Sequence, residues 1–145
     1  MLKTMTLLVV LGLASFAQAQ EFKAYTTDEA FGDVAFALEN AILAKGLVID
    51  HIAHTGEMLE RTRSATGSDK VLYLNADVYL FCSAAVSRQV MEADPANFNF
   101  CPYAIRLHEM PENPGTVIVS HQSYSGTMAP VEELMESIVK DALGQ

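Results

Sequence analysis

A β-hairpin pattern near the C-terminus places the strongest constraint on the fold. Apolar residues alternate with polar or small ones on both sides of the turn PENPG at 111–115: Tyr103, Ile105 and Leu107 before the turn, and Val117 and Val119 after it. Alternation with a period of two is typical of half-buried strands, and a short loop rich in proline and glycine joins antiparallel neighbours. The chain is therefore expected to contain an antiparallel strand pair with one buried face.

Strand and helix patterns alternate along the rest of the chain. Strand patterns occupy residues 22–26, 47–54 and 77–81. Helical spacing occurs at 31–42, around Met58 and Leu59, from Ser83 to the residue before Pro95, and from Pro130 onward. Thr26 and Glu29 have the spacing of a capping box before the first of these helices. The order β-α-β-α-β-α-β-β-α predicts an α+β two-layer sandwich, in which helices cover one face of a mixed β-sheet.

The N-terminus has the pattern of a signal peptide. Lys3 supplies the basic start, residues 7–13 form an almost unbroken apolar run, and Ala17-Gln18-Ala19 matches the small-x-small pattern that signal peptidase reads. We predict cleavage after Ala19, export to the periplasm or the medium, and a single domain at 20–145. No cysteine follows the apolar run, so the sequence does not support a lipoprotein anchor.

Charge and motifs exclude several functional classes. The 145 residues carry 18 acidic and 9 basic side chains, a formal charge of −9, which argues against a nucleic-acid or anionic-membrane partner. The sequence has no CxxCH, GxSxG, HExxH, P-loop or GxGxxG motif. Covalent c-type haem is therefore excluded, and no catalytic residue can be assigned from sequence.

Cys82 and Cys101 are the most informative pair, and three interpretations of them stay open. They can be small buried hydrophobic residues, a structural disulfide favoured by an oxidising compartment, or a functional thiol pair near a shared site. A disulfide meets a geometric difficulty. If the two strands run antiparallel, residues 96–100 must retrace a helix of about 12 residues, near 18 Å, and an extended chain of that length is barely long enough.

A soft-metal or haem site is a further hypothesis, with Cys82, Cys101, His51 and Met58 as weak candidate ligands. His51 and His54 lie three residues apart in a predicted strand, which sends their side chains to opposite faces, so they are not expected to chelate together. By the same alternation, His121 should share the inner face of its strand, and His108 should lie with Ala104 and Arg106.

Two segments carry a resemblance to a known family. Residues 44–51, AKGLVIDH, resemble the helix, KG and strand opening of the family called domain of unknown function 302. Residues 81–95, followed by FCPY at 100–103, resemble its second half, where a cysteine segment leads into a helix ending near Asp-Pro and a second cysteine precedes a strand. The resemblance covers roughly residues 22–125. It implies a two-layer α/β fold that forms homodimers.

These observations predict an exported small binding or accessory domain of unassigned ligand, which we expect to be non-catalytic. The alternatives are a periplasmic thiol or sulfur-redox protein, or a soft-metal or haem-binding protein, each using Cys82 and Cys101. Expected partners are a second copy of the chain and a small ligand or metal, with no nucleic acid and no membrane anchor after cleavage.

Overall fold

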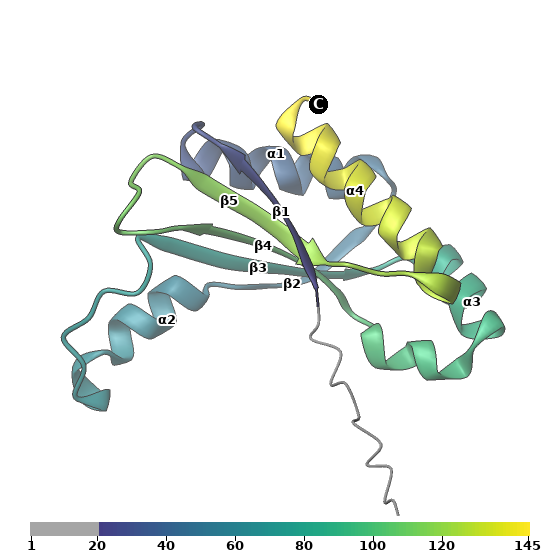
Figure 1. The fold of residues 1–145 in the computed structure, drawn as a ribbon, viewed down its shortest axis with the longest axis horizontal. Coiled ribbons are helices and arrows are strands. Elements are labelled where there is room, and N and C mark those ends of the chain that lie inside the picture. Colours follow the sequence, from purple (N-terminus) through teal and green to yellow (C-terminus); the bar gives the residue numbers. More distant parts are fainter. Residues whose placement is uncertain (1–20) are drawn as a thin grey trace, which may run out of the picture.

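The structure, a computed structural model, describes residues 21–145 (Figure 1). The predicted signal peptide at 1–19 lies outside the described residues. The strands are β1 (Phe22–Thr27), β2 (Val48–Ala53), β3 (Asn75–Cys82), β4 (Tyr103–Glu109) and β5 (Val117–Gln122). The α-helices are α1 (Phe31–Ala44), α2 (Thr55–Thr62), α3 (Ala84–Ala93) and α4 (Ala129–Leu143). Three short 3-10 helices join them: η1 (Ser64–Thr66), η2 (Pro95–Phe100) and η3 (Gly126–Met128). The predicted order of strands and α-helices is confirmed.

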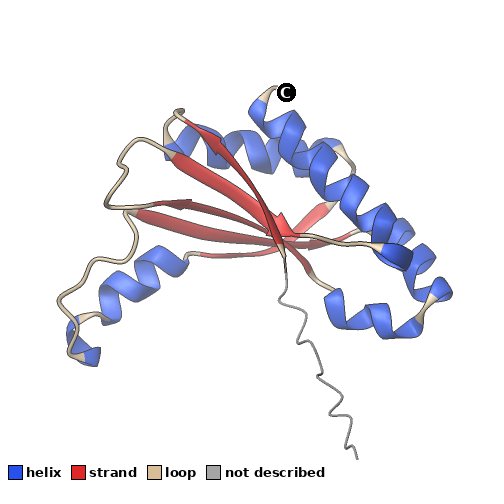
Figure 2. Cartoon of the chain, viewed as in Figure 1, coloured by secondary structure: helices blue, strands red, loops and turns tan. Residues whose placement is uncertain are grey.

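The five strands form one sheet in the order β1-β5-β4-β3-β2, and every neighbouring pair is antiparallel. The prediction of a mixed sheet was therefore wrong. The reason lies in the connections. α2 and η1 bring the chain back to the end of the sheet at which β2 finishes, so β3 starts at that end. α3 and η2 make the same kind of connection between β3 and β4 (Figure 2). These helices act as long loops between antiparallel neighbours and not as crossovers between parallel strands.

α1 and α4 cover one face of the sheet, and α3 continues that layer beyond α4 (Figure 1). Each of the two covering helices buries one apolar stripe with helical spacing. The stripes are Val34, Leu38, Ala41 and Ile42 on α1, and Val131, Met135, Ile138, Val139 and Ala142 on α4. From the sheet, the buried side chains include Tyr79, Phe81, Ile105, Leu107, Val117 and Val119. The two-layer α+β sandwich is confirmed.

The start of α1 differs from the expected capping box. Thr26 pairs with Ile118 in the sheet, so it belongs to β1 and is not free to cap a helix. The helix begins at Phe31, and its N-cap residue is Ala30, which makes no side-chain capping bond. Its end agrees with the prediction, since Lys45 is the C-cap and Gly46 follows with a φ of +73°. Ser83 caps α3 by accepting a hydrogen bond from the Val86 N–H.

The opposite face of the sheet carries no α1, α3 or α4 packing, and we call it the open face. Its residues are those that alternate with the buried ones: Phe22, Ala24, Thr26, Val48, His51, Ala53, Ala76, Val78, Leu80, Cys82, Ala104, Arg106, His108, Ile118, Ser120 and Gln122. Arg106 is the single Lys, Arg, Asp or Glu in this set, and its guanidinium lies 5.3 Å from the centre of the Phe22 ring. The open face is thus largely uncharged in a strongly acidic chain.

Candidate functional site

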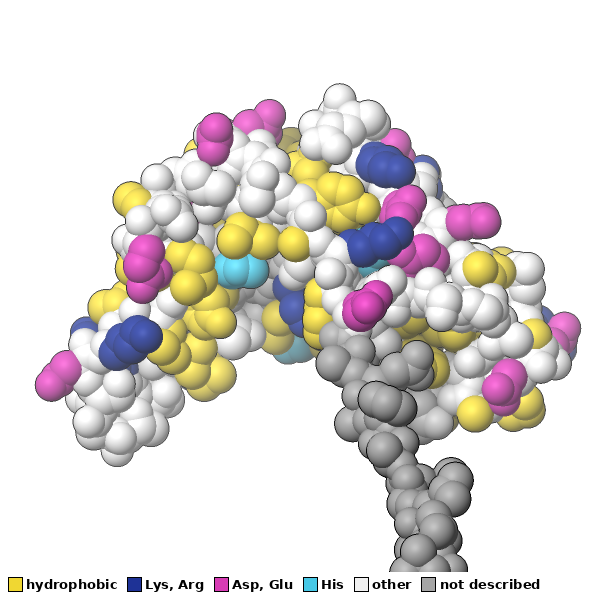
Figure 3. Space-filling view, in the orientation of Figure 1, with side chains coloured by type: hydrophobic (Ala, Val, Ile, Leu, Met, Phe, Trp, Pro, Cys, Tyr) yellow, Lys and Arg dark blue, Asp and Glu magenta, His cyan; other side chains and the backbone are white. Residues whose placement is uncertain are grey.

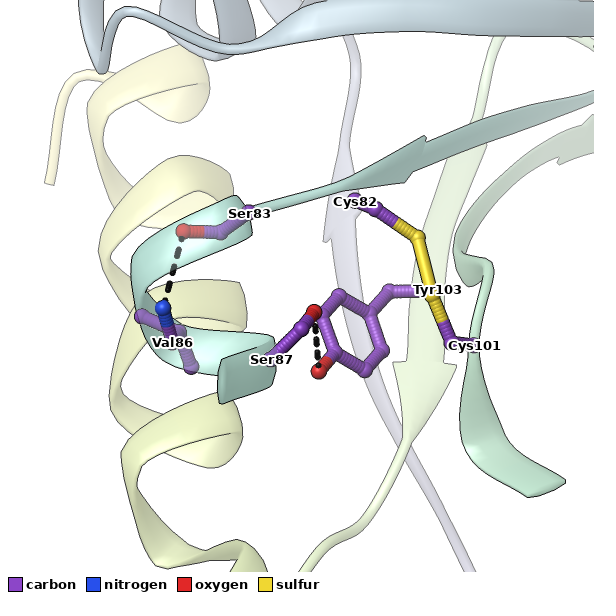
Figure 4. Close-up of a disulfide and its surroundings, with 6 residues drawn as sticks. All are labelled: Cys82, Ser83, Val86, Ser87, Cys101 and Tyr103. Atoms are coloured by element: carbon purple, nitrogen blue, oxygen red, sulfur yellow. Dashed lines mark hydrogen bonds between the residues drawn. A yellow bond between two sulfur atoms is a disulfide. The ribbon is translucent and has the colours of Figure 1, made fainter. Parts of the chain in front are cut away.

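Cys82 and Cys101 are joined by a disulfide, with their Cα atoms 6.6 Å apart (Figure 4). Cys82 is the last residue of β3, and Cys101 follows η2 just before β4. Of the three interpretations left open by the sequence, the structure therefore has the disulfide. The buried hydroxyls of Ser87 and Tyr103 lie 3.0 Å apart beside it and tie α3 to β4.

The expected geometric difficulty disappears because the connection is more compact than a long helix with an extended return. α3 has 10 residues, about 15 Å of helix. The return begins at Asp94, whose carboxylate accepts a hydrogen bond from the Ala96 N–H and starts η2. The six residues of η2 then pack back along α3, at a rise of about 2 Å per residue. The two cysteines are therefore brought to the same end of neighbouring antiparallel strands.

The four weak metal candidates do not form one ligand set. Both thiolates are consumed by the disulfide, His51 lies opposite Leu80 on the open face, and Met58 is on α2 with 42% of its surface exposed. Within residues 21–145, no three His, Cys, Asp or Glu side chains are grouped so that they could hold a metal ion. A site for a soft metal or haem axial ligand is not assembled from these residues in the oxidised chain.

His54 and Asp77 form a pair that the sequence did not single out. β2 ends at Ala53, and His54 is the N-cap residue of α2. Its Nδ1 lies 2.9 Å from Asp77 Oδ1. The Asp77 side chain points to the helix-covered face with Tyr79 and Phe81 and is 15% exposed, while the His54 side chain is 55% exposed. A half-buried carboxylate therefore orients an imidazole whose far side is open to solvent.

The surrounding acids favour the imidazolium form of His54. The hydrogen bond to Asp77 is the largest cause that raises the pKa of His54 above its ordinary value, followed by the charge of Asp77 and then those of Glu57 and Glu39. Glu39 also accepts a hydrogen bond of 3.5 Å from the Tyr79 hydroxyl, which brings a carboxylate of α1 to the same region. Burial is the first cause that raises the pKa of Tyr79, so that phenol stays neutral.

A cleft of about 490 Å³ opens beside this pair, between α2, the segment that leads into β3, and the start of α1. We call it the His54 cleft. Its lining combines apolar walls with a polar end: Phe31, Val71, Tyr73, Leu74 and Ala76 among the apolar and aromatic residues, and His54, Glu57, Glu60, Asn75 and Asp77 among the polar ones. Hydrophobic side chains gather over α2 and the segment that follows it in the space-filling view (Figure 3). Mixed walls of this size suit a small organic ligand.

Gly56 sets the position of α2 against the sheet. A Cβ atom at Gly56 would lie 2.7 Å from the backbone nitrogen of Ala76, so only glycine allows this approach. The contact matters because α2 has no buried residue of its own. The close backbone approach of Gly56 to Ala76 is therefore a main determinant of where His54 and Glu57 stand relative to Asp77.

The two remaining histidines lie where alternation places them. His121 is fully buried on the helix-covered face, stacks on Tyr25, and pairs through Nδ1 with the Gln122 carbonyl at 2.7 Å. Its Nε2 has no hydrogen-bond partner among the described residues. His108 is on the open face, where its ring and that of Tyr73 form a T-shaped pair, and burial lowers the pKa of His108. Neither joins the His54 cleft.

Comparison with known proteins supports the fold alone. No family model matches the chain, and no curated protein matches it. Among solved structures, the uncharacterized conserved protein DUF302 from Bacillus stearothermophilus superposes with a TM-score of 0.69, covering 83% of this chain and 97% of its own length. The chain has a DUF302-like fold. Sequence identity over this superposition is 11%, so the comparison confirms the fold implied by the resemblance and nothing beyond the fold.

Proposed function

We propose that this chain is an exported binding or accessory domain that holds a small organic ligand in the His54 cleft. The observation that carries the proposal is the His54–Asp77 pair, which presents an oriented imidazole at the edge of a cleft of about 490 Å³. Pockets that combine apolar walls with a few convergent polar groups and a perturbed titratable residue are the usual form of small-molecule sites. The DUF302-like fold adds no ligand, because the similar protein is itself uncharacterized.

The chemistry of the cleft favours binding over catalysis. His54 Nδ1 is engaged by Asp77, so Nε2 is the ring nitrogen left to hydrogen-bond a ligand. It donates in the imidazolium form and accepts in the neutral form whose proton is on Nδ1. Tyr73 and Phe31 offer aromatic surface, and Val71 and Leu74 remain 39% and 45% exposed. No serine or cysteine lines the cleft, which removes the two commonest nucleophiles from this site.

Export is part of the proposal and rests on the sequence pattern at 1–19. Within residues 21–145, every helix is too short or too polar to cross a bilayer. The disulfide between Cys82 and Cys101 agrees with an oxidising compartment, where such bonds form and persist.

We also propose that two copies pair through the open face. The family resemblance implies a homodimer but no particular interface, and the edge strands of the sheet are β1 and β2. The open face supplies a better argument. Two chains of formal charge −9 repel each other, and the paired positions of this face hold no carboxylate. They offer Phe22 and Val48, which are 51% and 71% exposed.

A redox or soft-metal role remains the second candidate function, because the disulfide is half-buried at the end of the sheet and is the single cysteine pair of the chain. Such a role requires reduction first, since a disulfide supplies no thiolate ligand or nucleophile. The ordinary structural contribution of a disulfide explains the pair without that step.

Native mass spectrometry of protein purified from the export compartment tests the binding proposal. The wild type should carry a small molecule, and Val71→Trp, which fills the cleft from an exposed position, should lose it. Leu43→Trp is the matched control, since Leu43 is 54% exposed on α1 and lies outside the cleft lining. A bound molecule that survives Val71→Trp would show that the ligand site is elsewhere.

A further inference from the structure

The charges that line the His54 cleft do not cancel. Asp77 is paired with the His54 imidazole, and Glu60 is paired with Arg63 at 2.8 Å. Glu57 makes no ion pair with any residue of the described chain, and no Lys or Arg is among the cleft-lining residues. A ligand in the cleft therefore meets one uncompensated carboxylate, and the nearby Glu39 carboxylate adds to the same negative potential.

The walls of the cleft add a second preference. Two aromatic side chains line the cleft: Phe31, at the start of α1, and Tyr73, in the segment that leads into β3. Both are only partly buried. Aromatic faces attract cations through the ring quadrupole, and this attraction adds to that of a carboxylate. The exposed aliphatic side chains of Val71 and Leu74 lie in the same lining and suit an apolar body next to a charged group.

We propose that the ligand of the His54 cleft is an organic cation, a primary or quaternary ammonium group attached to an apolar or aromatic body. The inference rests on the proposed binding function and names the ligand class of that same site. The ammonium group lies against Glu57 and the His54–Asp77 pair, and the apolar body lies between Tyr73, Val71 and Leu74. An anionic ligand of the same size would meet the Glu57 carboxylate, while the His54 imidazole is already paired with Asp77.

The ligand and a proton compete for the same acids. The groups that face His54 are Asp77 from β3, Glu57 from α2 and Glu39 from α1. A bound cation takes part of their attraction, so it should lower the pKa of His54, and protonation of His54 should weaken binding of the cation by the same factor. A lower pKa of His54 in the presence of the cation therefore shows that the cation occupies the cleft. A cation bound to an acidic surface elsewhere on the chain would leave this pKa unchanged.

Three probes that share a phenethyl group test the class: phenethylammonium, 2-phenylethanol and 3-phenylpropanoate. Each is titrated into the isotope-labelled mature protein and followed by NMR. Phenethylammonium should shift the Gly56, Asn75 and His54 resonances and bind about tenfold more tightly than 3-phenylpropanoate. Glu57→Gln should weaken its binding about threefold, as expected for an exposed ion pair. Glu133→Gln, an exposed acid on α4, should leave the affinity unchanged.

The outcomes separate the two proposals. If 2-phenylethanol or 3-phenylpropanoate binds the cleft as tightly as the cation, the inferred class is overturned while the cleft remains a ligand site. If no probe shifts the cleft resonances, or if Glu57→Gln and Glu133→Gln weaken binding equally, the cation inference is overturned. The native ligand measurement with Val71→Trp then decides the binding function by itself.

Discussion

His54 Nδ1 lies 2.9 Å from Asp77 Oδ1, and this contact joins the end of β2 to the helix-covered face of β3. The two residues are 23 positions apart in the sequence. Their contact depends on the antiparallel pairing of β2 with β3 and on the turn into α2, which holds the imidazole over the carboxylate.

Removing the Asp77 charge should lower the pKa of His54. Asp77→Asn takes away both the hydrogen bond and the charge that raise this pKa. The pKa of His54 should therefore return toward the ordinary histidine value. NMR titration of the His54 ring protons measures the change, with Asp28→Asn as a control for an acid that is not among the causes. Equal His54 pKa values in wild type and Asp77→Asn would contradict the pairing.

The same pair makes a small pH-dependent contribution to stability. Because the folded-state pKa of His54 is raised, its contribution is complete below the unfolded-state pKa and is lost as pH rises through the folded-state value. Denaturation of wild type and Asp77→Asn across this range should show a stability difference that shrinks toward alkaline pH. A difference that grows with pH would show the opposite linkage.

Gly56→Ala should destabilise the fold and displace α2. The added Cβ would meet the Ala76 backbone nitrogen at 2.7 Å, and backbone cannot rotate away as a side chain can. Forced overpacking of this kind costs about 1–3 kcal/mol in the free energy of unfolding. Gly32→Ala in α1 is the matched control, since nothing lies within 4 Å of its Cβ position, and it should be neutral or stabilising by about 0.5 kcal/mol. Urea denaturation compares the two.

Reduction of the disulfide should cost about 3 kcal/mol of unfolding free energy, the loop-closure value for a sequence separation of 19 residues. The Cys82→Ser, Cys101→Ser double variant should show a similar loss and be insensitive to reductant. Thiol counting on the native oxidised chain should find no reactive thiol even after unfolding, until reductant is added. Two thiols released by denaturant alone would contradict the bond.

A charge on the open face should disrupt the proposed dimer. Sedimentation at micromolar concentration should give about twice the mature monomer mass for the wild type, and Val48→Glu should shift it toward monomer because two new carboxylates approach each other. Val48 is 71% exposed, so the substitution leaves the core intact. Phe36→Glu, 69% exposed on α1, should leave the association unchanged. A monomeric wild type would remove the dimer proposal.

The export prediction has a direct measurement. The exported protein should begin at or next to Gln20, because Ala17 and Ala19 fit the small-residue positions of signal peptidase. Intact mass of the protein released from the periplasm without detergent gives the start position. A mass that still includes residues 1–19 would contradict cleavage.

Local sequence patterns determined the elements of this fold. The alternation around the PENPG turn, the apolar stripe after Pro130, the Ser83 cap and the Lys45-Gly46 end each depend on neighbours within a few residues, and the structure confirms all four. Such signals are local because helix and strand periodicity arises from backbone geometry. The face on which His121 lies followed from the same rule.

Tertiary structure alone decided how those elements meet. Whether β3 and β4 run parallel or antiparallel determines whether Cys82 and Cys101 share one end of the sheet, and a sequence pattern of a strand, a helix and a strand is compatible with both. The His54–Asp77 contact has the same origin: neither residue stands in a motif, and the antiparallel register of β2 and β3 brings them together across 23 positions. Long-range pairing depends on the packing of the whole sheet, which no short stretch of sequence encodes.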